Sequence, residues 1–382
     1  MTGQGDALDG VPAPQNFQTF LVRGAGLEPA HPCGRQDLNL VRLPISPPAR
    51  RNTKRPALAL ASRLASHPTR RLKSVNRVFY LQPPLPGADN QTVNPSASTA
   101  PAPSEHYENF PVASVLCPPR IRPAVSALYW FARTADDLAD EGDASAEERL
   151  TDLAQFRSDL VCVADGQSHS GRWPHVFVPL QGALQRFALP LSLLLDLLDA
   201  FEQDVAKTRD RLGYADEAEL LDYCRRSANP VGRLLLHLYG VNDGASLRQS
   251  DAICTALQLI NFWQDLSRDI PRGRHYLPAA DCAKQGVGAG ELEALQQTPA
   301  STRLIAQQCQ CARALMQSGA RLVHTVPDRA GWELRLVVQG GLRILDKIEH
   351  RAFATLAYRP QLNAWDFCVM LWRALWMRAP RR

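Results

Sequence analysis

Two pairs of aspartates have the type and spacing that metal-dependent chemistry needs. Asp136 and Asp140 are four residues apart, and Asp265 and Asp269 repeat that spacing further along the chain. In a helix, residues four apart stand on one face, one turn from each other. Like charges at that spacing destabilise a helix on its own. We therefore expect each pair to face a bound cation.

Mg²⁺ is the cation that fits such pairs best. It takes hard oxygen ligands, often one or two carboxylates together with phosphate oxygens and waters. Two helices facing each other could clamp bridging ions on a diphosphate. The metals and nearby arginines would then stabilise the charge that develops as a carbon–oxygen bond ionises. A single Asp-x-x-x-Asp pair is more often a solvated surface, but two in one chain favour Mg²⁺–diphosphate binding, with Mn²⁺ as an alternative ion.

Side chains near each pair could complete such a site. Arg133 and Tyr129 lie on the stripe of the first pair, one and two turns earlier, and Asn261 lies one turn before the second pair. A proline and a glycine then end the second helix. Arg274 and Tyr276 follow directly, where they can fold over whatever the carboxylates hold.

Helical periodicity predicts the elements that position these residues. From about residue 104 onward, apolar residues recur at three- and four-residue spacing, and alternating strand patterns are scarce. Proline and glycine fall mostly between the periodic segments. We therefore expect an all-α fold, with one helical domain over 104–382 and no internal repeat.

Residues 1–103 have a different composition. They hold 15 of the 29 prolines, and residues 1–100 hold 12 Lys and Arg against 5 Asp and Glu. Such a segment cannot bury enough apolar surface to offset its ordering entropy, so it is interpreted as disordered. A targeting peptide is one alternative. We favour a spurious extension, because residues 23–35 resemble a translated transfer-RNA gene. The basic charge of this stretch is poor evidence for nucleic-acid binding, and no nucleic acid is expected as a partner.

Several features predict a cytoplasmic protein. The nine cysteines are scattered without zinc-ligand spacing, which is typical of thiols in a reducing compartment. There is no apolar run of about 18 residues and no secretory signal pattern at the N-terminus. The run over 365–382 is apolar with basic residues late, so it could close the core or lie at a membrane interface as a peripheral contact.

The motifs resemble the squalene/phytoene synthase family over about residues 104–378. The first aspartate motif is Tyr129-x-Phe131-x-Arg133-x-x-Asp136-Asp137-x-x-Asp140. The middle of the match holds Tyr223-Cys224 and Pro230-Val231-Gly232. The second motif is Asn261-x-x-x-Asp265-x-x-x-Asp269, followed by Gly273-Arg274-x-Tyr276-Leu277-Pro278.

The resemblance implies a fold and a set of roles. The fold would be the single-domain isoprenoid synthase (terpenoid synthase) helical fold with a central active-site cavity. The implied Mg²⁺–diphosphate ligands are Asp136, Asp140, Asp265 and Asp269. The implied phosphate contacts are Arg133, Asn261 and Arg274, and Tyr223 is placed near the reactive carbons. Tyr129 and Tyr276 are further candidates for substrate binding.

The chain departs from the family pattern at two places. Most members have Arg where this chain has Gln264, directly before Asp265. The N-terminal block, usually a Ser/Lys-containing stretch, is replaced by His106-Tyr107-Glu108-Asn109-Phe110-Pro111. Both departures resemble the HpnC subgroup of bacterial hopanoid operons. Losing the Arg removes one phosphate donor, and Gln264 could suit a different substrate pose or help orient a water.

That subgroup implies a specific reaction. It is understood to convert presqualene diphosphate and water into hydroxysqualene, with companion enzymes that make the substrate and reduce the alcohol. Water capture needs no reductant, so NADPH is not expected. The alternative within the enzyme class is a head-to-head prenyltransferase that makes presqualene diphosphate, squalene or phytoene. The alternative outside it is an inactive helical diphosphate-binding assembly partner.

Some candidates have equally plain structural interpretations. Tyr223 could pack in the core, and His106 could be exposed at the edge of the N-terminal tail or contact phosphate. Asp199 and Asp204 lie on another acidic helix that could be a solvated face, although Asp204 matches a family position.

Overall fold

Local sequence signals set the ends of many helices. In this computed structural model, which describes residues 117–377, Ser145, Thr298 and Asn363 form capping boxes at helix starts. Gly240 and Gly273 end helical segments with φ of 73° and 79°, a conformation that glycine adopts without strain. The described residues form helices and no strands, which confirms the all-α prediction.

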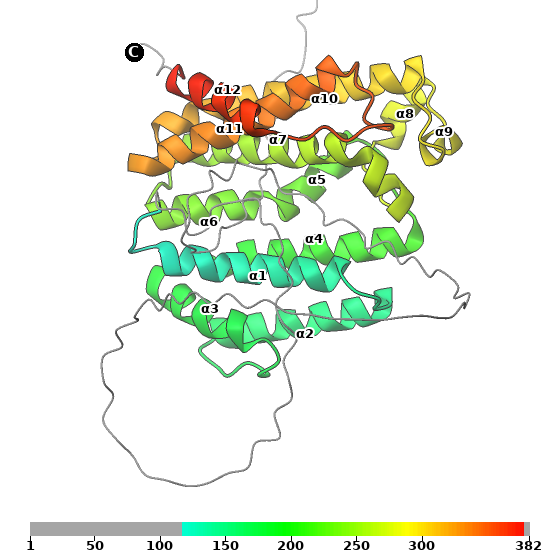
Figure 1. The fold of residues 1–382 in the computed structure, drawn as a ribbon. Helices are drawn as coiled ribbons and strands as arrows, with labels where there is room; N and C mark the ends of the chain where they lie inside the picture. Colours follow the sequence, from blue (N-terminus) through cyan, green and yellow to red (C-terminus); the bar gives the residue numbers. More distant parts are fainter. Residues whose placement is uncertain (1–116, 378–382) are drawn as a thin grey trace, which may run out of the picture. The chain divides into compact units, whose positions relative to one another are not determined.

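Twelve α-helices and two short 3₁₀ segments make up the described residues (Figure 1). They are α1 (Arg122–Asp140), α2 (Ala146–Ala164), α3 (Pro174–Phe187), α4 (Leu191–Asp210), α5 (Glu217–Ser227), α6 (Asn229–Tyr239), α7 (Gly244–Asp269), η1 (Ile270–Arg272), α8 (Ala279–Gln285), α9 (Ala289–Glu293), α10 (Pro299–Gly319), η2 (Ala320–His324), α11 (Asp328–His350) and α12 (Ala364–Leu375). None of the helices within 117–377 is long and apolar enough to cross a membrane.

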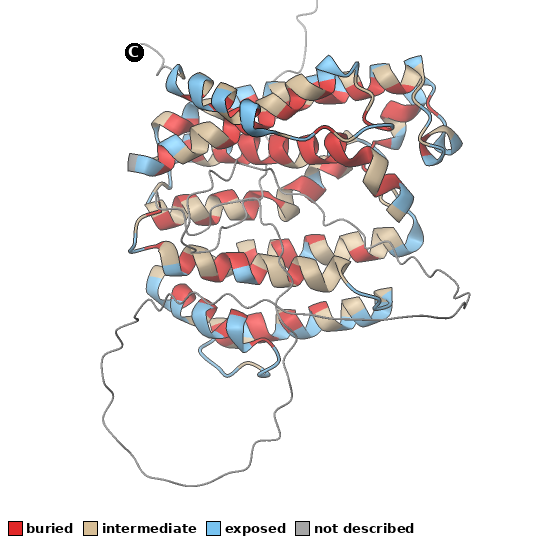
Figure 2. Cartoon of the chain, in the orientation of Figure 1, coloured by how far each residue is buried: buried red, intermediate tan, exposed pale blue. Residues whose placement is uncertain are grey.

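Two hydrophobic clusters divide the core. One is built mainly from α1 to α4, where α1 packs on α3, α4 and α2. The other surrounds α7, which packs on α10, α6, α11 and α5 and is buried along most of its length (Figure 2). Helix α6 contributes buried leucines to both clusters. The seam between the clusters runs between α1 and α7, the two helices that carry the aspartate pairs.

Close backbone contact joins α10 to α7 at Gly319. A Cβ atom there would lie 2.5 Å from the carbonyl oxygen of Gln249 and 2.9 Å from the amide nitrogen of Ile253, both on α7. Backbone atoms cannot rotate away as a side chain could. We expect Gly319→Ala to lower the free energy of unfolding by about 1–3 kcal/mol, measured by urea denaturation.

Gly182→Ala is the matched control for this prediction. Gly182 lies inside α3, and nothing lies within 4 Å of the position its Cβ would take. Alanine there should be neutral or stabilise by up to about 1 kcal/mol, through its helix propensity. Equal effects of the two substitutions would contradict the close contact at Gly319.

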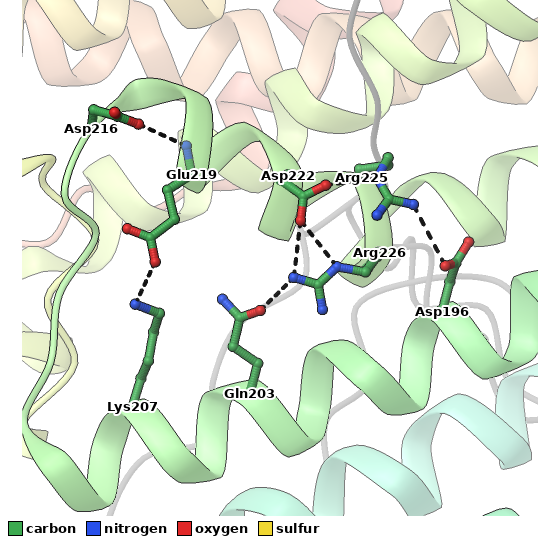
Figure 3. A network of polar contacts seen from close by, with 8 residues as sticks. All are labelled: Asp196, Gln203, Lys207, Asp216, Glu219, Asp222, Arg225 and Arg226. Carbon is green, nitrogen blue, oxygen red and sulfur yellow. Dashed lines mark hydrogen bonds and ion pairs between the residues drawn. The ribbon is translucent and has the colours of Figure 1, made fainter.

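A polar network fixes α5 against α4 (Figure 3). Lys207 on α4 pairs with Glu219 on α5 at 2.8 Å, and Arg226 on α5 donates to Gln203 on α4. Arg225 reaches Asp196 of α4 at 3.6 Å. Because these contacts fix the register of the two helices, they also fix where Tyr223 of α5 meets α4.

Candidate active site

The structure brings the ends of α1 and α7 together. Arg274, which follows α7, forms an ion pair with Asp140 at the end of α1. Burial works to lower the pKa of Arg274, but the ionisable groups beside it outweigh burial and raise the pKa. These groups are Tyr276, Asp204, Asp140 and Asp269. One guanidinium thus lies among carboxylates from α1, α4 and α7.

The clustered carboxylates hold their protons more tightly than usual. Burial, with repulsion from Asp140, raises the pKa of Asp136 to about 6, although Arg133 works against the shift. Burial and repulsion from Asp265 raise the pKa of Asp269 to about 7. Water reaches 45% of the Asp136 side chain, so this carboxylate is open to a ligand that enters from solvent. Burial is the main cause of both shifts, and repulsion between neighbouring carboxylates adds to it.

The helix dipole makes the end of α1 a still less favourable place for carboxylates. The last turn of α1 carries Asp137 and Asp140 and has no basic residue. A helix C-terminus carries partial negative charge, so carboxylates there are disfavoured unless a cation lies nearby. Arg133, one turn earlier, is shared among Asp136 at 3.6 Å, Asp137 at 2.7 Å and Glu141 at 3.0 Å. This end of α1 is suited to binding positive charge.

The residues present fit a divalent cation that also binds substrate oxygens. Asn261 Oδ1 and Asp269 Oδ1 are buried acceptors with no hydrogen-bond donor among the described residues. Oxygen acceptors without donors are what Mg²⁺ takes as ligands. Within 117–377, no three His, Cys, Asp or Glu side chains are close enough to hold a metal by themselves. The arrangement matches the Mg²⁺ habit of binding one or two carboxylates and completing its shell with phosphate and water.

A guanidinium that the sequence did not reveal pairs with Asp265. Arg359, in the segment between α11 and α12, contacts both carboxylate oxygens of Asp265, and its Nη2 donates to Oδ2 at 3.1 Å. Burial raises the pKa of Asp265, and Arg359 partly offsets this. Nothing local in the sequence marks Arg359, because 94 residues separate it from its partner.

Gln264 lies beside this pair but faces the same segment. Its side chain is only 2% exposed, and its Nε2 donates to the carbonyl oxygen of Pro360 at 2.8 Å. Its Oε1 has no donor among the described residues. Gln264 thus anchors the backbone next to Arg359. A role in orienting water or setting the substrate pose stays a prediction.

Gln264→Leu tests this anchoring. The substitution keeps the volume roughly constant but leaves the buried Pro360 carbonyl without its donor. We expect it to lower the free energy of unfolding by about 1–3 kcal/mol, measured by urea denaturation, and to speed proteolysis between α11 and α12. Gln317→Leu, on the exposed side of α10, should have little effect on either measurement. Unchanged proteolysis in Gln264→Leu would show that the hydrogen bond does not hold this segment.

Tyr223 is bound to the acidic cluster rather than simply packed in the core. Its hydroxyl donates to Asp204 Oδ2 at 2.5 Å. Burial, with the nearby Asp204 charge, raises the pKa of Tyr223 well above its ordinary value, so the phenol stays protonated. Asp204 therefore belongs to the site, whereas Asp199 on the same helix pairs with Arg157 at 2.6 Å, away from the cluster. The interpretation as a solvated face holds for Asp199 only.

Aromatic rings pack tightly beside the carboxylates. Tyr276 stacks on Phe262 with ring centroids 3.7 Å apart, and Tyr223 and Tyr214 lie about 6 Å from Tyr276. All four rings are buried. Since neighbouring rings restrict each other's rotation, Tyr223 and Tyr276 present their hydroxyls to the cluster from fixed positions. The structure thus places Tyr276 inside the predicted site.

An apolar cavity of about 150 Å³ lies at the seam of the two core clusters. Its wall includes Tyr129 and Ala132 of α1, together with Ile253 and Leu257 of α7. Ala132 and Leu257 are each one helical turn before a site residue, Asp136 and Asn261. The cavity therefore extends away from the acidic cluster along α1 and α7, as a site for a polar head and an apolar tail would require.

All but one of the predicted site residues lie within the described part of the chain. Tyr129 lines the cavity, and Asn261 is buried on α7 one turn before Asp265. Seven others belong to the acidic cluster: Arg133, Asp136, Asp140, Tyr223, Asp269, Arg274 and Tyr276. Asp265 and Gln264 contact the segment that contains Arg359. His106 lies outside the described residues.

Known proteins share this sequence pattern and fold. The family model for squalene/phytoene synthase matches residues 104–366. The hydroxysqualene synthase of Rhodopseudomonas palustris is 32% identical over 72% of this chain and 90% of that protein. The hydroxysqualene synthase of Sinorhizobium fredii is 34% identical over 63% of this chain and 78% of its own.

A solved structure supports the same assignment. The squalene synthase HpnC from Alicyclobacillus acidocaldarius superposes with a TM-score of 0.58 at 35% identity, covering 63% of this chain and 88% of that one. A dehydrosqualene synthase shares the fold at 20% identity, with a TM-score of 0.60 over 68% of this chain and 88% of that one. The chain belongs to the squalene/phytoene synthase family of isoprenoid synthase enzymes.

Proposed function

We propose that this enzyme converts presqualene diphosphate and water into hydroxysqualene and diphosphate, with Mg²⁺ bound by the aspartate pairs. The observation that carries the proposal is the cluster of carboxylates from α1, α4 and α7 beside Arg274, next to an apolar cavity. The relatives named hydroxysqualene synthase support the choice of substrate. A lipid diphosphate has the matching division into a charged head and an apolar tail.

The arginines of the site would exchange partners when substrate binds. Arg274 pairs with Asp140 and Arg359 with Asp265 in this structure. Bound Mg²⁺ would neutralise these carboxylates and the diphosphate together. The two guanidinium groups could then turn to phosphate oxygens, which they bind in the same forked geometry as a carboxylate.

The proposed reaction releases diphosphate, forms a carbocation and captures one water. The bond between carbon and the diphosphate oxygen breaks, and both electrons leave with the diphosphate. Arg133, Arg274 and Arg359 stabilise that growing charge. After the carbon skeleton rearranges, a water oxygen bonds to the cation and releases one proton. Nothing is oxidised or reduced overall, so the proposed reaction uses no NADPH, and buried apolar walls keep other waters out.

The product distinguishes hydroxysqualene formation from head-to-head prenyl transfer. Purified protein receives presqualene diphosphate and Mg²⁺ without NADPH, in water enriched in ¹⁸O, and the products are analysed by mass spectrometry. We expect hydroxysqualene that carries ¹⁸O in its hydroxyl group, and none after chelation of the metal. Mn²⁺ should replace Mg²⁺ in part. Failure to consume presqualene diphosphate, with turnover of farnesyl diphosphate instead, would disprove the proposal.

The second candidate is a head-to-head prenyltransferase. It is favoured by the phytoene synthase of Thermus thermophilus, which is 31% identical over 70% of this chain and 88% of its own length. A presqualene diphosphate synthase of Rhodopseudomonas palustris is 28% identical over 66% of this chain.

Enzymes that supply presqualene diphosphate and reduce hydroxysqualene are the partners that the proposed reaction requires. We expect the enzyme to work in the cytoplasm with peripheral membrane contact.

A further inference from the structure

Helix α12 turns its charged side chains inward and its apolar side chains outward, the reverse of an ordinary surface helix. Its only two charged side chains point toward the protein. Asp366 is 1% exposed and pairs with Arg343 at 2.7 Å and with Lys347, both on α11. Arg373 pairs with Asp346 of α11 at 2.7 Å. A helix on a water-exposed surface normally turns its charges outward.

The outward side of α12 is apolar throughout. The larger exposed side chains of α12, with Trp376 directly after it, are together named the α12 apolar face: Trp365, Cys368, Leu371, Trp372, Leu375 and Trp376. They recur at three- and four-residue spacing, so they form one stripe, and Figure 2 shows exposed positions along this helix. Trp365 is 72% exposed and Trp372 is 62% exposed. Contiguous exposed apolar surface of this kind marks a contact with a protein or a membrane.

Helix α11 extends this surface. Trp332 is 44% exposed, and the Arg335 guanidinium lies 4.7 Å from its ring. Arg335 also donates to the carbonyl oxygen of Met377 at 2.7 Å, so it fastens the end of α12 to α11. A cation thus lies between a tryptophan of α11 and the end of the α12 apolar face.

The chemistry of this surface fits an anionic lipid bilayer. Tryptophan prefers the headgroup level of a membrane, because its ring is apolar and its N–H is polar. No acidic residue follows Asp366, whereas Arg378, Arg381 and Arg382 close the sequence. Basic residues beside an amphipathic helix are attracted to anionic headgroups. We propose that the α12 apolar face lies in the headgroup region of an anionic membrane.

The position of α12 links this contact to the cavity. Helix α11 packs against α12, and its Leu334 and Val337 line the apolar cavity. A bilayer bound at α12 is therefore separated from the cavity by one helix. The proposal does not depend on the proposed reaction, because its test uses no substrate.

The test uses the full chain and vesicles of phosphatidylcholine with or without phosphatidylglycerol. We expect the protein to sediment with the vesicles that contain phosphatidylglycerol. Brominated acyl chains should quench its fluorescence, since three of the seven tryptophans lie on this face. Replacing Trp365, Trp372 and Trp376 by Ser should weaken partitioning roughly tenfold or more. Val178→Ser with Leu212→Ser, which removes exposed apolar side chains elsewhere, should bind as the wild type does.

Four outcomes would overturn the proposal. Equal sedimentation of the triple variant would assign binding to other basic residues, such as those between 50 and 71. Fluorescence that brominated lipid leaves unchanged would mean that something else covers α12. If the wild type is a dimer that does not bind vesicles, and the triple variant is a monomer, this face is a contact between two copies of the chain. If the triple variant does not fold by circular dichroism, Trp365→Ser alone is measured, and unchanged partitioning overturns the proposal.

Discussion

Replacing Asp136 and Asp265 together by Asn should reduce turnover of a prenyl diphosphate by at least about a thousandfold. Each change keeps the side-chain volume and removes one negative charge from the acidic cluster. The metals that neutralise the leaving diphosphate would lose a charged ligand on each side. Steady-state assays of diphosphate release measure the effect, and circular dichroism should show nearly unchanged helical content.

Asp199→Asn is the matched control. It also removes a carboxylate from a helix of the site, α4, but Asp199 pairs with Arg157 outside the cluster. Its activity should stay close to that of the wild type. A thermal shift caused by Mg²⁺ with inorganic diphosphate should persist in this control and vanish in the double variant. A double variant with wild-type activity would rule out the aspartate pairs as metal ligands.

The sequence predicted the parts of the site that depend on local spacing. The position of Asp140 relative to Asp136 follows from one helical turn, and the turn after Asp269 follows from a proline and a glycine. Both predictions rest on residues close together in the chain, where backbone geometry alone decides the arrangement. The all-α fold was predictable for the same reason.

The pairings across the fold could not be predicted in this way. Arg359 meets Asp265 and Gln264 meets Pro360 only because α11 and the following segment return to the end of α7. Sequence spacing carries no information about contacts between residues that are more than 90 positions apart. The missing Arg at position 264 suggested the loss of a phosphate donor. The structure shows that Arg359 puts a guanidinium on the neighbouring carboxylate.

The same limit applies to α12. The sequence run over 365–382 left a core-closing helix and an interfacial helix as alternatives. Met370 and Ala374 are buried on its inner side, while Trp365 and Trp372 are exposed on its outer side. The helix therefore closes the core and also presents an apolar surface. The ion pairs of Asp366 and Arg373 with α11 help to decide which side faces inward, and no local pattern specifies these partners.

Asp269→Asn should stabilise the metal-free protein at alkaline pH. The pKa of Asp269 is raised to about 7 in the folded protein by burial and by Asp265, whereas an unfolded chain releases the proton near its ordinary value of about 4. Between these values the folded state binds more protons than the unfolded state. The folded state therefore loses stability as pH rises from about 4 to 7, and this cost is complete above pH 7.

Asparagine cannot ionise, so it removes this cost. We expect the variant and wild type to have similar free energies of unfolding near pH 4 to 5. At pH 8 the variant should be more stable by on the order of 2–4 kcal/mol. Urea denaturation in a chelator at several pH values measures the difference, with Asp143→Asn on the exposed α1–α2 loop as the control. A difference that does not grow with pH would mean that Asp269 is already ionised in the folded protein and that the cluster carries its charge without a metal. A difference that grows with pH would instead mean that the ionised Asp269 lowers the stability of the metal-free protein. The same carboxylate is a proposed cation ligand, so the group that destabilises the fold is also the one that would bind the metal.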